Sequence, residues 1–152
     1  MAAAAQLKRF IFRKVLLPLN HFKFKTLYGM DIGEHARISR TARLDMTNPK
    51  GIHIGSHTAV VGGASVLSHD FVNRQWHDTY VGSHCFIGYN AVILPGVKVG
   101  NHCIVSANTV VARDVPDNSV VVGNPGRVVE RDIVTGPWGI RLDKGNDSEV
   151  AY

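Results

Sequence analysis

An aliphatic residue returns every six positions through most of this 152-residue chain. All twelve positions of the series are Ile, Leu or Val, with four extra residues before the fourth position and nine before the seventh. The series consists of Ile32, Ile38, Leu44, Ile54, Val60, Val66, Val81, Ile87, Ile93, Val99, Val105 and Val111. Because a fixed short period is typical of stacked repeat proteins, the pattern predicts an all-β solenoid with a continuous aliphatic core.

Two other positions of the repeat agree with this prediction. The residue four places after each aliphatic one is small, in the set Ala36, Ala42, Thr58, Ala64, Cys85, Ala91, Val97, Cys103, Thr109 and Val115. The residue three places after it mostly belongs to a type that tolerates a positive φ. This second set is His35, His57, Gly63, His69, His84, Asn90, Gly96, His102, Asn108 and Asp114, with Thr41 and Thr47 as exceptions. Each six-residue unit is therefore predicted to form one short strand and one tight turn. Three such units are expected to close one triangular coil, so the twelve units make about four coils.

The repeat over residues 32–129 resembles that of the hexapeptide-repeat acyltransferases, whose fold is a left-handed parallel β-helix. The left-handed sense is implied by this resemblance and not by the period itself. We expect three parts along the chain: a basic N-terminal arm with a capping helix over residues 1–30, the β-helix over residues 31–129 with a loop insertion at 70–79, and an irregular C-terminal tail over residues 130–152.

The repeat breaks directly after His69. The next position should hold a small inward residue, but it holds Asp70, a charge that a core does not accept without a partner. The insertion that follows contributes polar and aromatic side chains, among them Asn73, Arg74 and Trp76. Function is expected where a regular repeat is broken and such residues gather. Because an imidazole titrates near neutral pH, His69 is a candidate for proton transfer.

The segment from Ser65 to Asp70, SVLSHD, resembles the catalytic segment of the sugar and xenobiotic O-acetyltransferases of this family. In that family this histidine is the general base: it removes a proton from an acceptor hydroxyl, which attacks the thioester carbonyl of acetyl-CoA directly. The resemblance therefore implies His69 as the catalytic base. Asp70 is a candidate for orienting the imidazole, as carboxylates commonly do, and a backbone carbonyl would serve equally.

The segments at residues 111–119 and 122–129 resemble the end of the acetyl-CoA site in the same family. The residues that match the family's motif, and are implied to bind acetyl-CoA, are Tyr89, Ala107, Ala112, Arg113, Gly123, Asn124, Pro125 and Arg127. Two positions depart from the pattern: Gly126 replaces a small side chain, and Glu130 replaces a second basic residue found in some members. The resemblance also implies a homotrimer with its active sites at the subunit interfaces.

We therefore predict an acetyl-CoA-dependent O-acetyltransferase that acts on a saccharide hydroxyl, with acetyl-CoA as co-substrate and no required metal. Asn73, Arg74 and Trp76 are predicted to bind the acceptor, because an indole stacks on a sugar face and a guanidinium meets a phosphate or carboxylate. Three alternatives stay open: N-acetylation of an amino sugar, often nucleotide-linked; a xenobiotic acceptor; and a non-catalytic β-helix scaffold.

Four of the eight histidines fall at the same corner of successive predicted coils, namely His35, His57, His84 and His102. We interpret them as turn residues, because histidine tolerates the turn conformation. The β-helix enzymes that resemble carbonic anhydrase bind zinc through three histidines, two of them five residues apart after a long gap. That spacing has no match in this chain, so no metal site is predicted.

The net charge of +5 belongs to the N-terminal arm. Residues 1–30 hold six basic and no acidic side chains, whereas residues 31–152 hold 11 basic and 12 acidic ones. The β-helix is therefore close to neutral, and the charge does not indicate nucleic-acid binding. Within the arm, Leu7–Leu17 is predicted to form a short helix ended by Pro18. Its apolar side would cap the open end of the prism, and contact with an anionic membrane is the alternative.

The remaining features predict a soluble, cytoplasmic protein. No apolar run reaches the ~18 residues of a membrane span, and the N-terminus lacks the pattern of a signal peptide. The two cysteines are too few for a disulfide framework. The glycine, proline and polar residues of 136–152 predict a loosely held tail.

Overall fold

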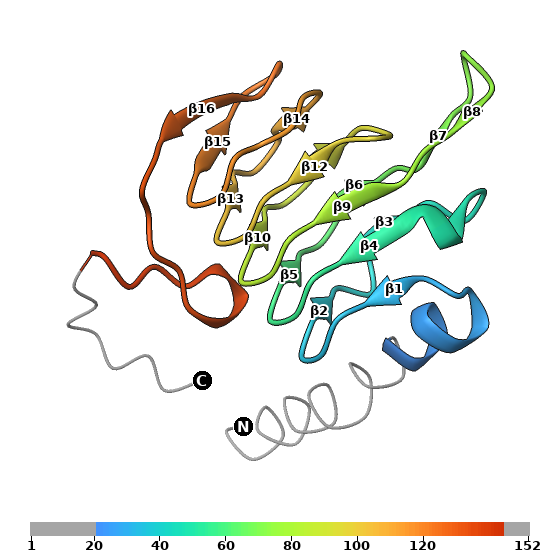
Figure 1. The fold of residues 1–152 in the computed structure, drawn as a ribbon, viewed down its shortest axis with the longest axis horizontal. Helices are drawn as coiled ribbons and strands as arrows, with labels where there is room; N and C mark the ends of the chain where they lie inside the picture. The colour runs from blue at the N-terminus through green and yellow to red at the C-terminus, as the bar shows by residue number, and fades with distance from the viewer. Residues whose placement is uncertain (1–20, 145–152) are drawn as a thin grey trace, which may run out of the picture.

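The computed structural model describes residues 21–144, which form a triangular prism of short parallel strands (Figure 1). The first face consists of β1 (Asp31–Ile32), β4 (Ile52–Ile54), β9 (Thr79–Val81) and β12 (Lys98–Val99). The second face consists of β2 (Arg37–Ile38), β5 (Ala59–Val60), β10 (Phe86–Ile87), β13 (Ile104–Val105) and β15 (Val120–Val122), with β16 (Arg127–Glu130) added antiparallel at its end. The third face consists of β3 (Arg43–Leu44), β6 (Ser65–Val66), β11 (Val92–Ile93) and β14 (Val110–Val111). The predicted solenoid of parallel strands is therefore confirmed.

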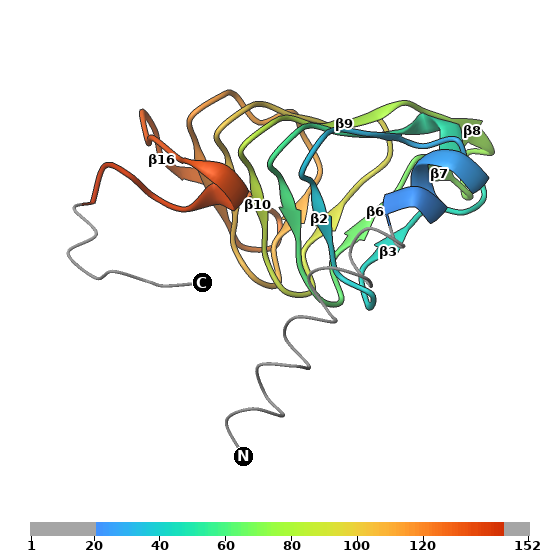
Figure 2. The same cartoon turned by 90° about the horizontal axis from the view of Figure 1, so that it is seen from below.

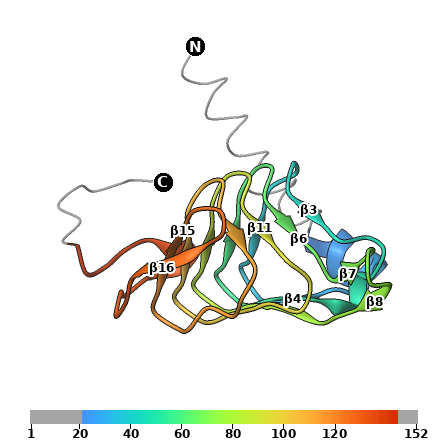
Figure 3. The same cartoon turned by 90° about the horizontal axis from the view of Figure 1, so that it is seen from above.

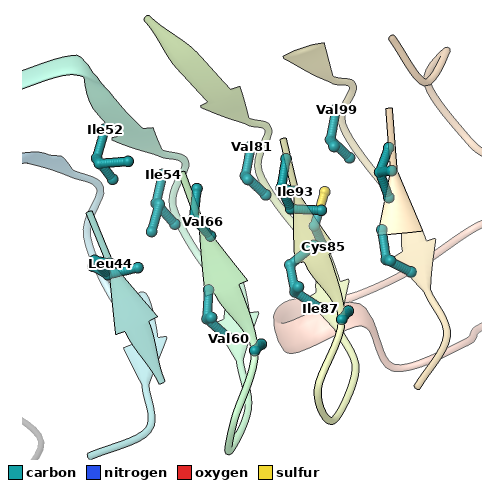
Figure 4. Packing of buried hydrophobic residues seen from close by; sticks show 14 of the residues in the cluster. Leu44, Ile52, Ile54, Val60, Val66, Val81, Cys85, Ile87, Ile93 and Val99 are labelled. Atoms are coloured by element: carbon teal, nitrogen blue, oxygen red, sulfur yellow. The ribbon is translucent and has the colours of Figure 1, made fainter. Parts of the chain in front are cut away.

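Strands of successive coils pair in register, so equivalent positions of the repeat stack on one another. On the first face Ile32 pairs with Ile54, and Ile54 pairs with Val81. All twelve aliphatic residues of the repeat are buried, and none is more than 5% exposed. Figure 4 shows part of this core, in which side chains such as Leu44, Val60 and Ile87 lie one layer beside the next. Because each such burial contributes about 1.5–3 kcal/mol, the aliphatic core is a main source of the stability of the prism.

The chain turns at three corners in each coil. The first corner connects the third face to the first face. The second corner connects the first face to the second face. The third corner connects the second face to the third face. Positive φ angles occur at the second corner, at His35, His57, His84 and His102, at the third corner, at Gly63, Asn90 and Asn108, and at the first corner, at Gly96. The predicted turn position is confirmed for these eight residues. It is wrong for His69, which lies in a strand, and for Asp114, which accepts a hydrogen bond from the backbone N–H of Lys98 (2.8 Å).

Residues 21–30 lie against the N-terminal end of the prism and contain η2 (Lys23–Leu27), a single π-helical turn. Phe24 and Met30 are buried there as part of the hydrophobic core, and His21 Nε2 lies 3.1 Å from the carbonyl oxygen of Gly33. Figure 2 shows the coils stacked between this turn at one end and β16 at the other. The helix predicted over Leu7–Leu17 lies outside the described residues.

A loosely held tail is predicted for residues 136–152, but the described part of this region, residues 136–144, belongs to an ordered segment that follows β16 and spans residues 131–144. Residues 145–152 lie outside the described residues. The ordered segment folds back along the second corner, and we call it the C-terminal strap (Figure 1). Ile133 and Thr135 are buried. The Thr135 hydroxyl donates to the carbonyl of His84 (2.7 Å), and the carbonyl of Thr135 lies 2.9 Å from His102 Nδ1.

Trp138 extends the strap to the first two coils. Its backbone N–H donates to the carbonyl of His57 (2.6 Å), and its indole N–H donates to the carbonyl of His35 (2.9 Å). The guanidinium carbon of Arg37 lies 3.2 Å from the centre of the indole ring. These contacts explain why composition did not predict an ordered strap. The strap is held mainly through backbone carbonyls of the turns, and such carbonyls leave no pattern in the side-chain composition.

Candidate active site

Both insertions of the repeat lie at the first corner. Residues 45–51 connect β3 to β4 and include η3 (Pro49–Gly51), and residues 67–78 connect β6 to β9 one coil later. Because successive coils stack in register, the two insertions lie next to each other, on the side of the prism where β7 and β8 project (Figure 3). The two insertions bring the side chains of Asp45, Asn48 and Ser68 together at the base of the segment that carries His69.

The second insertion is a β-hairpin and not the loop expected at residues 70–79. β7 (His69–Asp70) pairs antiparallel with β8 (Gln75–Trp76), with His69 opposite Trp76. Arg74, at the end of the connecting turn, has a φ of 53°. The turn forms because the Asp70 carboxylate accepts hydrogen bonds from the backbone N–H (3.0 Å) and the side-chain amide (2.6 Å) of Asn73.

The imidazole of His69 lies near two aromatic side chains of the hairpin. Its ring centre is 5.3 Å from that of Trp76 and 6.2 Å from that of Phe71, which meets it edge-on. His69 is half-buried, whereas Trp76 is 62% exposed. The structure therefore brings together the predicted base and one predicted acceptor-binding residue, both within reach of solvent.

Asp70 has a different set of contacts. Neighbouring residues of one strand point to opposite faces, and the Asp70 carboxylate is bound to Asn73 on the turn rather than to the ring of His69. The backbone and side-chain hydrogen bonds from Asn73 hold the pKa of the Asp70 carboxyl below its usual range. In this structure Asp70 closes the turn, and Asn73, predicted to bind the acceptor, is its partner.

Asp45 binds the backbone at the base of the hairpin. One carboxylate oxygen accepts hydrogen bonds from the N–H groups of Ser68 (3.0 Å) and His69 (2.9 Å), and the other accepts from Thr47 (2.8 Å). Partial burial raises the pKa of this carboxyl, but the backbone hydrogen bonds outweigh that effect and leave the pKa below its usual value. Asp45 is therefore ionised at neutral pH.

Asn48 joins the two strands of the hairpin at the same place. Its side-chain amide donates to the carbonyls of Ser68 (3.0 Å) and His77 (3.1 Å), while the buried hydroxyl of Ser68 donates to the carbonyl of Asn48 (2.6 Å). A Cβ atom at Gly51 would collide with the Asn48 amide nitrogen and the His77 carbonyl, so only glycine leaves room for this arrangement. Sequence reasoning missed Asp45 and Asn48, although both lie between Leu44 and Ile54, where the repeat has four extra residues, one coil before the longer insertion.

The residues predicted to bind acetyl-CoA lie on both sides of the third face. Ala112 and Arg113 are exposed at the first corner, directly after β14, and Tyr89 and Ala107 are exposed at the third corner. The other four, Gly123, Asn124, Pro125 and Arg127, lie in or directly after the turn from β15 to β16, where the Asn124–Pro125 peptide bond is cis. One chain thus presents these eight residues as two separate surfaces flanking one face, and does not gather them into a single pocket.

The four histidines of the second corner are stacked, with successive ring centres 4.9, 5.1 and 5.0 Å apart. Their positive φ angles confirm the interpretation as turn residues. Within residues 21–144, no cluster of three or more His, Cys, Asp or Glu side chains is placed to hold a metal ion. In the same range, no helix has the length and apolar character needed to cross a membrane.

Residues 78–113 match the family model described as bacterial transferase hexapeptide (six repeats). The chain is 31% identical over 83 residues to YvoF of Bacillus subtilis (strain 168), an acetyltransferase by name; the match covers 53% of this chain and 48% of YvoF. It is also 31% identical over 102 residues to protein CapG of Staphylococcus aureus, covering 60% of this chain and 59% of CapG. The chain thus spans between 48% and 59% of the length of these curated relatives.

Solved structures share the fold. A hexapeptide-repeat acetyltransferase from Vibrio cholerae superposes with a TM-score of 0.62 at 22% identity, covering 86% of this chain and 89% of that chain. A maltose O-acetyltransferase from Clostridium difficile 630 superposes with a TM-score of 0.57 at 23% identity, covering 71% of this chain and 72% of that chain. An N-acyltransferase from Bacillus cereus, solved with dTDP and coenzyme A, gives a TM-score of 0.57 at 18% identity, covering 64% and 60% of the two chains.

Proposed function

We propose, because the chain carries the bacterial transferase hexapeptide repeat and resembles hexapeptide-repeat acetyltransferases in sequence and fold, that it is an acetyltransferase of this type. The reaction that we propose is transfer of the acetyl group of acetyl-CoA to a saccharide hydroxyl. The observation that carries the proposal is His69: a half-buried imidazole beside an exposed indole, on a hairpin at the point where the repeat is interrupted.

In the proposed reaction His69 is the general base. The imidazole accepts the proton of the acceptor hydroxyl as the hydroxyl oxygen attacks the carbonyl carbon of the thioester. The carbon–sulfur bond then breaks, and the leaving sulfur takes up the proton that the imidazole holds. The products are an acetyl ester and the free thiol of CoA. An imidazole suits both proton transfers because it titrates close to neutral pH.

The exposed part of the hairpin supports a saccharide as acceptor. Trp76 presents an exposed indole next to His69, and apolar sugar faces stack on such rings. Arg74 is exposed at the turn and carries a charge that suits a carboxylate or phosphate on the acceptor. A sugar bound against Trp76 would therefore place a hydroxyl near the proposed base.

The donor site is proposed to lie between two subunits of a homotrimer. Within one chain, Ala112 and Arg113 flank the third face on the side of the hairpin, while Tyr89 and Ala107 flank it on the other side. A neighbouring copy that brings its third corner against the first corner of this chain would unite the two surfaces beside His69. The pantetheine arm would then lie along exposed small side chains, and Arg127 would meet a phosphate.

The test is an acceptor screen with the wild-type chain. Purified protein is given acetyl-CoA and a panel of neutral sugars, amino sugars and nucleotide sugars, while thiol release and the mass of the product are followed. We expect an acetyl ester on a saccharide hydroxyl. Acetylation confined to amino groups would replace the proposal by N-acetylation, and no thiol release with any acceptor, despite saturable CoA binding, would contradict it.

A further inference from the structure

We propose that Asp45 is a positioning residue for His69, which it holds in place through the peptide backbone. This role rests on the proposed function of His69 and goes beyond it, because a side chain on the preceding coil would fix the position of the base. Asp45 follows β3 on the first coil, while His69 follows β6 on the second.

The geometry at Asp45 is that of a carboxylate held by backbone donors. Two successive N–H groups, of Ser68 and His69, converge on one oxygen at 3.0 and 2.9 Å, and the N–H of Thr47 meets the other oxygen at 2.8 Å. Successive backbone N–H groups that point to one place form a binding site for an anion. The negative charge of Asp45 fills that site, so the backbone at His69 is connected to the rigid prism by charge-assisted hydrogen bonds.

The hairpin needs such a connection because it is too short to hold its own position. β7 and β8 contain two residues each, and their pairing consists of His69 with Trp76 and Asp70 with Gln75. An isolated two-stranded hairpin is at best marginally stable. The place of His69 relative to the prism therefore depends on the base of the hairpin, where Asp45 binds one strand and Asn48 joins both.

Asp45 acts on the reaction through the backbone and not by contact. Its carboxylate accepts hydrogen bonds from backbone N–H groups, those of Thr47, Ser68 and His69 among them, and the ring of His69 has its own contacts with Phe71 and Trp76. Loss of the carboxylate would therefore shift the imidazole without removing a group that binds either substrate. A positioning residue of this kind affects kcat and leaves KM for the donor unchanged.

The experiment compares Asp45→Asn with Asp117→Asn. Asp117 is the matched control: it is not one of the eight residues predicted to bind acetyl-CoA, and its carboxylate also accepts a backbone hydrogen bond from the preceding coil, from Asn101 (2.7 Å), but at the second corner. We expect Asp45→Asn to lower kcat by about 10- to 100-fold with an unchanged KM for acetyl-CoA, since small displacements of a catalytic group have effects of that size. Asp117→Asn should keep the kcat of the wild type.

Amide hydrogen exchange gives a second readout that needs no turnover. Exchange at Ser68 and His69 should become about 10- to 100-fold faster in Asp45→Asn and stay unchanged in Asp117→Asn, because the uncharged amide offers one acceptor oxygen in place of two and makes no charge-assisted hydrogen bond. Asp45→Glu, which keeps the charge but moves the carboxylate by one methylene group, serves as a second variant if Asp45→Asn does not fold. It too should exchange faster at these amides and lose kcat.

Unchanged exchange at these two amides in the Asp45 variants, or an equal loss of kcat in Asp45→Asn and Asp117→Asn, would overturn the proposal. Failure of the proposed function would look different. In that case the wild-type chain would transfer no acetyl group, while exchange at Ser68 and His69 would still be faster in Asp45→Asn and the backbone connection would stand.

Discussion

Backbone conformation separates His69 from the four stacked histidines. The histidines of the second corner have φ angles between 55° and 57°, whereas His69 lies in β7 opposite Trp76. Asparagine tolerates the left-handed turn nearly as well as histidine does, so a turn histidine is replaceable by a residue without a titratable ring. A general base is not replaceable in this way. We therefore expect His69 and the four stacked histidines to respond differently to replacement by asparagine.

At the residue scale, Trp76→Ala should weaken acceptor binding. Aromatic stacking contributes about 0.5–1.5 kcal/mol, so we expect KM for the acceptor to rise about 2- to 10-fold. The KM for acetyl-CoA is the internal control and should not change, because Trp76 is not one of the residues predicted to bind acetyl-CoA. An unchanged KM for the acceptor would show that the indole does not bind the sugar.

A second residue-scale prediction concerns Arg141, which binds Glu130 through two hydrogen bonds of 2.7 Å and also pairs with Asp143. The hydrogen bond from Arg141 lowers the pKa of Asp143 from 3.8 to about 2. A carboxyl with a lowered folded-state pKa stabilises the fold above its unfolded pKa and loses this contribution as the pH falls toward the folded value. The stabilisation of the fold by the Arg141–Asp143 pair should therefore be complete above about pH 4 and disappear toward about pH 2.

Thermal unfolding of the wild type and of Arg141→Gln measures this effect. The variant should have the lower Tm at neutral pH, and the difference should shrink as the pH is lowered through the stated window. A Tm difference that does not depend on pH would mean that Arg141 acts through packing of its side chain and not through the two carboxylates.

At the scale of elements, the hairpin and the C-terminal strap are attached to the prism in different ways. The hairpin is bound at its base by side chains of the preceding coil, Asp45 and Asn48, and its tip is exposed. The strap lies along the second corner and is bound mainly by backbone carbonyls of the turns. The strap thus covers the second corner and not the first corner, where His69 lies, or the third corner, where Tyr89 and Ala107 lie.

Trp138→Ala should weaken the contact of the C-terminal strap with the first two coils. The variant loses a cation–π contact with Arg37, worth about 0.5–2 kcal/mol, and an indole hydrogen bond to His35, worth about 1 kcal/mol. We expect the free energy of unfolding in urea to fall by about 1–3 kcal/mol. Trp76→Ala is the matched control, since the same truncation at an exposed indole should change stability by about 0.5 kcal/mol or less. Equal losses in both variants would contradict the anchoring role of Trp138.

The elements also show what the sequence predicts and what it does not. The prism follows from the period of six, because every aliphatic position of the repeat is buried in the core. The hairpin does not, since its strands are two residues long and its turn depends on Asp70 and Asn73. The strap was mispredicted, because its main partners are carbonyl oxygens. Asp45 and Asn48 were missed, although the gap that contains them lies at the same corner as the hairpin. The left-handed sense stays a prediction from the family resemblance.

At the scale of the whole molecule, the proposed donor site requires two subunits. Mixing two inactive variants tests this: His69→Asn lacks the base, and Ala107→Trp fills the predicted donor surface at the third corner. Each shared site would take His69 from one subunit and Ala107 from its neighbour. In an equal, random mixture each of these two residues is intact in half of the cases, so about one quarter of the sites have both intact. We therefore expect refolded mixtures to regain about a quarter of wild-type turnover, and a mixture as inactive as its parents would contradict a shared site.

The basic N-terminal arm is the other whole-molecule feature. Residues 21–30 cover the first coil through Phe24 and Met30, which belong to the core. The cap predicted for the earlier part of the arm, and its alternative contact with an anionic membrane, fall on residues outside the described range and stay predictions. The charge of +5 reflects this arm and not the corner that carries His69.

The central claim is that His69 acts as a base and not as a turn residue, and one substitution made at two positions tests it. His69→Asn and His35→Asn are compared by thiol release from acetyl-CoA, with the best acceptor from the screen. We predict that His69→Asn lowers kcat by about 10²- to 10⁴-fold, the usual contribution of a general base, while His35→Asn keeps the activity of the wild type. Turnover of His69→Asn within a few-fold of wild type, or equal losses in the two variants, would contradict the account.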